Sequence, residues 1–263
     1  MKRKLKVLWN GLRGLRMFDL LRMYLFRRRG QGASIYYSPW FHKKLVLRPN
    51  TADYHTLVST MMGYHLPKNT LHPLGDTLTI VDLGSNIGLT LLDFKRLYPS
   101  AKIYGVEMDL DNFEMAQKNC SDEKGIDIVH AAISCADGWA QYNKTKNTDA
   151  YSICSPVESG QGLIKVPALT IRSLMKQLNV TRIDYLKMDI EGVEYDLFTS
   201  PEEEMAWLND VQQLNIEYHR DSPETIISVL RQRGFVVEFS KTHWSSIYAY
   251  RTDGSNMICE KNI

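Results

Sequence analysis

The pattern of hydrophobic and polar positions changes at residue 77. From there on, short apolar runs rich in β-branched residues alternate with segments that repeat apolar positions at helical spacing. The runs predict strands over residues 77–83, 102–106, 126–133, 183–188, 211–216, 235–239 and 247–250. The segments between them predict helices over residues 90–98, 110–119, 170–178, 192–198 and 223–233. Such alternation predicts right-handed βαβ units and an open, mainly parallel α/β sheet. Because the last two strands have only a short connection, we expect one antiparallel strand at the end of the sheet.

The rest of the chain is organised around this region. The other expected elements are a linker or turn over 30–39, a strand over 44–48, a helix over 53–62, a breaker-rich connection over 67–76, and a hairpin around 139–142 within an irregular stretch, 134–166. The expected division is a basic helical extension over residues 1–32, a strand-and-helix cap segment over 33–76 and the sheet domain over 77–263.

The net charge of +2 conceals an uneven distribution. Residues 1–30 hold ten Lys or Arg and one acid, a local charge of +9, whereas residues 31–263 hold 22 basic and 29 acidic residues and carry −7. Apolar residues recur in the basic segment at three- and four-residue steps, at Leu8, Leu12, Leu15, Phe18, Leu21 and Leu25. This predicts an amphipathic helix that lies at an anionic membrane surface or, alternatively, packs on the body or on a partner protein.

The composition limits the class of protein. The 263 residues are 44% hydrophobic and 24% charged, which is typical of a soluble globular chain. The four cysteines form no C-x-x-C pair, and neither a membrane-spanning run nor a secretory signal is evident. We therefore expect a cytoplasmic protein, with peripheral contact at the inner face of the membrane through residues 1–30. The acidic remainder offers no broad surface for nucleic acid.

The strongest chemical signal is D-L-G-S-N-I-G at residues 82–88, between the first strand and the first helix of the alternating region. Glycine lets the backbone approach a ligand, and Glu107 ends the next strand, where an acid can accept hydrogen bonds from ribose hydroxyls. A third glycine is missing from the dinucleotide pattern, and Asp82 would repel a diphosphate. The loop therefore favours a cationic nucleoside, S-adenosylmethionine (SAM). The alternative is a tight strand-to-helix turn that Asp82 caps.

A second group of polar residues follows the fourth and fifth strands. Asp189 and Glu191 lie two positions apart just past one strand, and Glu217 and His219 repeat this relation after the next. Side chains at this edge of a parallel sheet meet the ligand, so the group can take a proton from a hydroxyl, orient it, or hold a divalent ion.

Each member of this group also has a structural interpretation. Asp189 can cap the following helix, Glu217 can pair with Arg220, and His219 can be a satisfied edge histidine. We interpret the other histidines considered as structural: His65, His72, His130 and His243.

Further segments complete a recognisable pattern. They are P-A-L-T-I-R-S-L at 167–174, Y-L-K-M-D-I-E-G-V-E at 185–194, L-R-P-N-T-A-D at 47–53 and E-Y-H at 217–219. With the 82–88 loop and Glu107, these segments resemble the FkbM-type methyltransferases over roughly residues 44–220. The resemblance implies a Rossmann-like class I methyltransferase fold and SAM-dependent methyl transfer, usually to a hydroxyl of a sugar or secondary metabolite. Met108 follows Glu107 where the family commonly has proline.

The expected function is therefore SAM-dependent O-methylation, with a sugar of a glycan or glycolipid as the favoured acceptor and a lipid-linked one if residues 1–30 touch a membrane. The catalytic candidates are Asp189, Glu191, Glu217 and His219, with His219 or Asp189 as the base. The cofactor-binding candidates are Asp82, Gly84, Ser85, Asn86, Gly88, Glu107, Met108 and Ala132. No dedicated metal site is expected, although the oxygen ligands leave a magnesium-assisted reaction open.

Two other classes of protein stay open. An NAD-dependent sugar-nucleotide enzyme would share the sheet and usually carries a Tyr-x-x-x-Lys pair, for which Tyr142 and Lys146 have the spacing. A non-catalytic membrane adaptor with a degenerate methyltransferase body has no need of the loop and the acids, and their presence argues against it.

Overall fold

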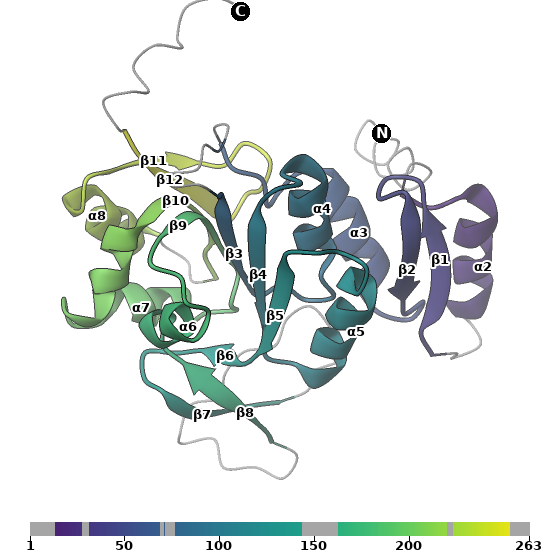
Figure 1. Cartoon of the computed structure of the whole chain (residues 1–263), viewed down its shortest axis with the longest axis horizontal. Helices are drawn as coiled ribbons and strands as arrows, with labels where there is room; N and C mark the ends of the chain where they lie inside the picture. The colour runs from purple at the N-terminus through teal and green to yellow at the C-terminus, as the bar shows by residue number, and fades with distance from the viewer. Residues whose placement is uncertain are drawn as a thin grey trace, which may run out of the picture.

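Seven strands form the central sheet of the computed structural model, which describes residues 14–27, 32–68, 71, 77–143, 163–219 and 223–252 (Figure 1). The strand order is β11-β12-β10-β9-β3-β4-β5. The strands are β3 (Thr79–Leu83), β4 (Lys102–Glu107), β5 (Ile126–His130), β9 (Ile183–Met188), β10 (Val211–Glu217), β11 (Phe235–Phe239) and β12 (Ser246–Arg251). All neighbouring pairs are parallel except those made by β12. This confirms the Rossmann-like α/β fold. The antiparallel strand lies one position inside the edge, because α8 carries the chain past it and β12 then returns between β10 and β11.

Helices cover both faces of this sheet (Figure 1). The helices on one side are α3 (Asp53–Met61), α4 (Leu89–Leu97) and α5 (Leu110–Cys120), which share one apolar cluster. Those on the other are α6 (Ile171–Gln177), α7 (Glu194–Thr199), the 3₁₀ helix η1 (Glu204–Asp210) and α8 (Glu224–Gln232). Every residue of β9 is buried, which is expected of a parallel strand covered on both faces.

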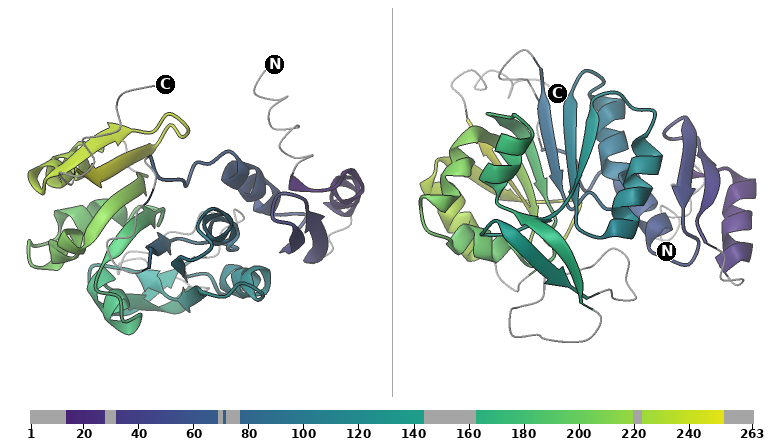
Figure 2. Two further views of the ribbon diagram at one scale, coloured as in Figure 1. Left: turned by 45° about the horizontal axis from the view of Figure 1, so that its top comes forward. Right: turned by 60° about the horizontal axis from the view of Figure 1, so that its bottom comes forward.

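An N-terminal layer packs outside α3 and α5 (Figure 2). It consists of the hairpin β1 (Ser34–Ser38) and β2 (Lys43–Leu47), covered by α2 (Met17–Arg27). The expected linker over 30–39 is therefore wrong at Ser34–Ser38, since Tyr36 is buried and pairs with β2. Leu15, Leu45 and Leu47 extend the α4–α5 cluster. The proposed division at residues 32 and 76 stays a prediction, and residues 1–13 and 28–31 of the basic extension lie outside the described part.

A second, smaller sheet lies beside the central one. It has the order β6-β8-β7, with β6 (Ala132–Ile133), β7 (Gly138–Tyr142) and β8 (Ile164–Leu169). The expected strand over 126–133 is thus divided between two sheets, and the stretch over 134–166 is less irregular than expected. Val166 and Ala168 of β8 are buried, and this packing stabilises a strand that the sequence pattern did not indicate. Among the described helices, none has both the length and the apolarity needed to cross a bilayer.

Candidate functional site

The loop after β3 is built around two glycines in the left-handed region. Gly84 has φ +84°, and a Cβ placed on it would lie 1.9 Å from the carbonyl oxygen of Asp189. Its N–H and that of Ser85 donate to the Val106 carbonyl at 3.0 and 2.9 Å. Gly88 has φ +80° and is the N-cap residue just before α4, where a Cβ would meet Ala116 at 3.2 Å. The loop is therefore held against the ends of both β4 and β9, and only glycine fits at residue 84.

Asn86, within this loop, contacts Glu107 at the end of β4. The Asn86 N–H donates to Glu107 Oε2 at 2.8 Å, and the Asp109 N–H donates to Glu107 Oε1 at 2.8 Å. Burial raises the pKa of Glu107 to about 7, against the lowering effect of these two hydrogen bonds. The Asn86 side-chain oxygen is buried and has no hydrogen-bond partner among the described residues. A buried, orphaned acceptor beside a carboxylate is what a ligand with hydroxyl or ammonium donors would satisfy.

Asp82 lies beneath the loop and is fully buried. Its carboxylate accepts hydrogen bonds from Thr90 Oγ1 and from Lys187 Nζ, the latter at 3.0 Å. Lys187 also donates to the Gly84 carbonyl at 3.2 Å. Burial alone would lower the pKa of Lys187, but the charges of Asp82, Tyr64 and Asp189 raise it well above its usual value. From the sequence we expected the charge of Asp82 to face the ligand, but in the structure this carboxylate is paired with Lys187.

Two cofactor candidates lie beyond Glu107. Ala132 is buried in the small sheet, and Met108 is half-buried against the same apolar cluster. His130 contacts the Met108 carbonyl at 3.0 Å, and its ring stacks on Phe113. Met108 and Ala132 thus belong to an apolar cluster that follows Glu107 along the chain.

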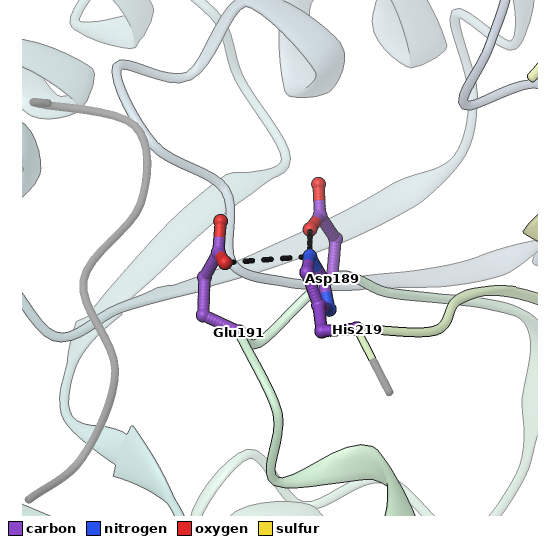
Figure 3. Close-up of side chains that lie close together, drawn as sticks. All are labelled: Asp189, Glu191 and His219. Carbon is purple, nitrogen blue, oxygen red and sulfur yellow. Dashed lines mark ion pairs between the residues drawn. The ribbon is translucent and has the colours of Figure 1, made fainter. Parts of the chain in front are cut away.

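The second candidate group converges on His219, as Figure 3 shows for Asp189, Glu191 and His219. His219 Nε2 lies 3.6 Å from Asp189 Oδ1, 3.4 Å from Glu191 Oε2 and 4.0 Å from Glu217 Oε1. Glu191 adopts φ +56°, which is uncommon for a residue other than glycine. The strand-end placement expected from the sequence thus brings all four catalytic candidates together.

Glu194 is a site residue that sequence analysis missed. It is buried at the start of α7, and its carboxylate accepts from the backbone N–H groups of Ile190 and Gly192, both at 2.8 Å. His219 Nδ1 lies 3.1 Å from Glu194 Oε1. A proton on Nδ1 that donates to Glu194 leaves Nε2 directed at Asp189 and Glu191. Its position in the E-G-V-E run is the only sequence signal that pointed to it.

Charge explains the ionisation of this group. Burial alone would lower the pKa of His219, but the hydrogen bond to Glu194 and the charges of Glu194, Glu191 and Asp189 raise it to about 9. Burial and the charge of Asp189 raise the pKa of Glu217 to about 7. The cluster therefore contains an imidazole and a carboxyl group that both exchange protons near or above neutral pH.

The carboxylate and imidazole atoms of this cluster could also bind a cation. One ligand atom each from Asp189, Glu191 and His219 lies within 4.8 Å of the others. Two basic side chains already lie beside these carboxylates. Lys187 Nζ is 3.5 Å from Asp189 Oδ2, and His219 Nε2 is 3.6 Å from Asp189 Oδ1.

Aromatic residues extend from this centre to the surface, and sequence analysis had set one of them aside as structural. His243 Nδ1 lies 3.7 Å from Glu217 Oε1, and its ring lies 6.1 Å from that of Tyr64 and 6.2 Å from that of Trp244. Trp244 is 85% exposed. Lys187 Nζ lies 5.8 Å from the centre of the Tyr64 ring, so the aromatic strip, which consists of Tyr64, His243 and Trp244, runs from the buried Lys187 outward.

Several structural alternatives from the sequence can now be placed. Helix α7 begins after Val193 with no side-chain cap, so Asp189 does not cap it. Helix α4 likewise begins at Gly88 without a side-chain cap, so Asp82 does not cap that turn. Arg220 and Lys146, the partners considered for Glu217 and Tyr142, lie outside the described residues.

The sequence of this chain is similar to that of known methyltransferases. The family model described as the methyltransferase FkbM domain matches residues 82–237. Methyltransferase 1 of Beauveria bassiana (strain ARSEF 2860) is 23% identical over 194 residues, which cover 66% of this chain and 78% of that protein. Methyltransferase sdnD of Sordaria araneosa is 25% identical over 202 residues, covering 63% and 76%.

Solved structures with a similar fold include a precorrin-6y C5,15-methyltransferase from Geobacter metallireducens GS-15 (TM-score 0.43, 11% identity, 74% of this chain and 88% of that one). The N-terminal domain of human METTL16 in complex with SAH is also similar (TM-score 0.42, 14% identity, 79% and 72%).

Proposed function

The chain belongs to the FkbM methyltransferase family and is a SAM-dependent methyltransferase, and on this premise we propose that it methylates a hydroxyl oxygen, with a sugar as the acceptor. The observation that carries the oxygen-directed reaction is His219, which Glu194 holds through Nδ1 so that Nε2 faces Asp189 and Glu191. A neutral hydroxyl is a weak nucleophile, so a base held in this way can activate it by removing its proton.

The loop residues fit the cofactor. When bound, SAM supplies a methyl group that is already activated by its positively charged sulfur. Glu107 keeps a free lone pair on each carboxylate oxygen for ribose hydroxyls, and the orphaned Asn86 oxygen accepts a further donor. Ser85 and Gly88 shape the loop, and Met108 and Ala132 belong to the apolar cluster that follows Glu107. We assign Asp82 a supporting role, since it holds Lys187 against the Gly84 carbonyl.

The chain's own groups then orient the acceptor and take its proton. Asp189 and Glu191 present carboxylate oxygens that accept a hydrogen bond from the acceptor hydroxyl and align it. His219 Nε2 accepts the proton as the oxygen forms its new bond to carbon, and Glu194 stabilises the resulting imidazolium. Glu217, beside Ser245 and His243, binds a second hydroxyl of the same acceptor. Alignment in such a site contributes several kcal/mol, in order of magnitude, to lowering the barrier.

The aromatic strip favours a sugar over a simple alcohol. A pyranose has apolar C–H faces and a ring of hydroxyls. The exposed Trp244 offers a flat apolar surface beside His243, which in turn contacts Glu217. We extend the proposal to a lipid-linked glycan as the acceptor, which would bring the protein to the inner face of a membrane.

Mass spectrometry of a panel of soluble acceptors tests the reaction. Incubation with SAM is expected to add one methyl group to sugar hydroxyls and to leave matched amines unchanged. A parallel series with a strong chelator tests the magnesium-assisted variant: activity that survives excludes a metal requirement. Methylation of amines alone, or tight binding of a nicotinamide dinucleotide with none of SAM, would contradict the proposal.

Replacing Trp244 with alanine is expected to raise the KM for a sugar acceptor roughly two- to tenfold, since stacked aromatic contacts contribute roughly 0.5–1.5 kcal/mol beyond their buried area. The KM for SAM and the turnover at saturating sugar should change little. Trp139→Ala is the matched control, because Trp139 is also exposed but lies on β7, in the small sheet. Equal effects of the two variants would remove the aromatic strip from the acceptor site.

A further inference from the structure

Helix α2 presents an apolar face to the solvent. Met17, Phe18, Leu21 and Leu25, the outer face of α2, are 67%, 72%, 56% and 54% exposed. At about 100° per residue these positions fall within roughly one quarter to one third of the helix circumference. Large apolar side chains gathered on one exposed face mark an interaction surface rather than a scatter of single residues.

Polar contacts hold the helix in this orientation. Asp19 lies on the opposite side, nearly buried, and accepts a hydrogen bond from the Tyr37 N–H at 3.1 Å. Arg22 donates to the Ile35 carbonyl, and its guanidinium lies 4.6 Å from the centre of the Tyr36 ring. Leu15, just before the helix, is fully buried. The polar groups therefore hold α2 on the hairpin, and Met17, Phe18, Leu21 and Leu25 are exposed instead of packing on the body, which was the alternative interpretation of this segment.

The position of α2 leaves this face accessible. Both views in Figure 2 place α2 at the outer side of the hairpin β1–β2, at the end of the molecule opposite β11 and β12. No described element covers it there. The site at the ends of β9 and β10 lies in a different part of the structure, so a flat surface can be bound by α2 without occupying that site.

We propose that the outer face of α2 inserts into the interface of an anionic lipid bilayer. Its apolar residues would enter the boundary between head groups and acyl chains, as in interfacial amphipathic helices. The surrounding segment supplies the matching charge, since residues 1–30 carry +9 and anionic head groups attract such clusters. Pairing with the same face of a second copy is disfavoured, because it would bring two segments of +9 together.

This surface does not rest on the proposed function. A protein that binds bilayers and methylates something other than a sugar would leave it intact. A protein that methylates soluble sugars and does not bind bilayers would overturn it and leave the proposed O-methylation of a sugar unaffected.

Co-sedimentation of the full chain with vesicles tests the proposal. The protein is expected to pellet with phosphatidylcholine vesicles that contain phosphatidylglycerol, and to stay in the supernatant with phosphatidylcholine alone. The triple variant Phe18→Ser, Leu21→Ser and Leu25→Ser should lower the partition at least about tenfold, because it removes the apolar residues that enter the interface. Since these side chains are exposed, the variant should keep the circular dichroism spectrum and the SAM affinity of the wild type.

Trp139→Ser combined with Phe239→Ser is the matched control, because both residues are comparably exposed on other strands. It should pellet like the wild type. Wild-type protein that stays in the supernatant, or a triple variant that pellets unchanged, would overturn the proposal. A wild-type dimer that the triple variant converts to monomer, without binding of wild type to vesicles, would assign the face to a second copy instead.

Discussion

The Gly84→Ala variant is expected to lose measurable SAM binding, a fall in affinity of at least about 100-fold. Two effects combine at this position. A left-handed backbone costs a non-glycine residue roughly 1–2 kcal/mol. In addition, the new Cβ would sit 1.9 Å from the Asp189 carbonyl oxygen, so the loop and the end of β9 must separate. Asn86 and Glu107, which this loop holds together by a hydrogen bond, would then lose the arrangement that we propose for binding the ribose. Titration calorimetry with SAM measures the effect.

Gly138→Ala separates backbone strain from the clash. Gly138 has φ +147°, and a Cβ placed on it meets nothing within 4 Å, so its replacement strains the backbone without displacing a neighbour. It lies on β7, and we expect SAM binding to be retained. Thermal unfolding of both variants shows whether each is folded. A folded Gly84→Ala protein with wild-type affinity would refute the assignment of the loop.

The sequence pattern predicted the central sheet well because the apolar residues that mark each strand lie within that strand. Every residue of β9 is buried, and four apolar residues mark the strand although Asp184 and Lys187 lie among them. Strand β1 has no such signal: Ile35 is exposed while Tyr36 is buried, and the strand follows a stretch rich in glycine. It forms because β2 pairs with it and because Tyr36 packs into the cluster beneath α4 and α5. Such short strands are fixed by tertiary contacts that no local pattern contains.

Some residues of the site could likewise be predicted from the sequence, and others could not. Asp189, Glu191, Glu217 and His219 could be grouped from the sequence because parallel strands end at one edge of a sheet. The pairing of Lys187 with Asp82 could not, since it depends on which strands are neighbours. Only the order β9-β3 and its register place these two residues opposite each other. A lysine inside a buried strand was the available clue, because a buried charge requires a partner.

Glu194 was missed for a different reason. Its carboxylate reaches His219 only because the chain turns sharply at Glu191 and Gly192, both at positive φ. A local backbone conformation of this kind is a property of the folded loop. The D-I-E-G run indicated that something tight occurs there, but not which side chain it would bring to the imidazole.

Replacing His219 with alanine is expected to lower turnover about 10²–10⁴-fold, the usual contribution of a general base. The affinity for SAM should stay within a factor of about two, since the loop contacts do not involve this residue. Asp189→Asn should also lower turnover, because it removes the charge that we propose aligns the hydroxyl. His55→Ala, an exposed histidine on α3, is the control. Unchanged turnover in both site variants would remove these residues from the catalytic machinery.

The pH dependence distinguishes a base from a residue that only shapes the site. The proton acceptor must be the neutral imidazole, and the pKa of His219 is raised to about 9, so kcat/KM should rise with pH and level off above about 9. Glu194→Gln keeps an oxygen for the Nδ1 proton but removes the charge that helps to hold the pKa high. Its rise should therefore be displaced to lower pH, while His219→Ala should lose this step altogether. A profile that stays the same in Glu194→Gln would mean that Glu194 does not set the ionisation of His219, and a step that persists in His219→Ala would assign the base to another group.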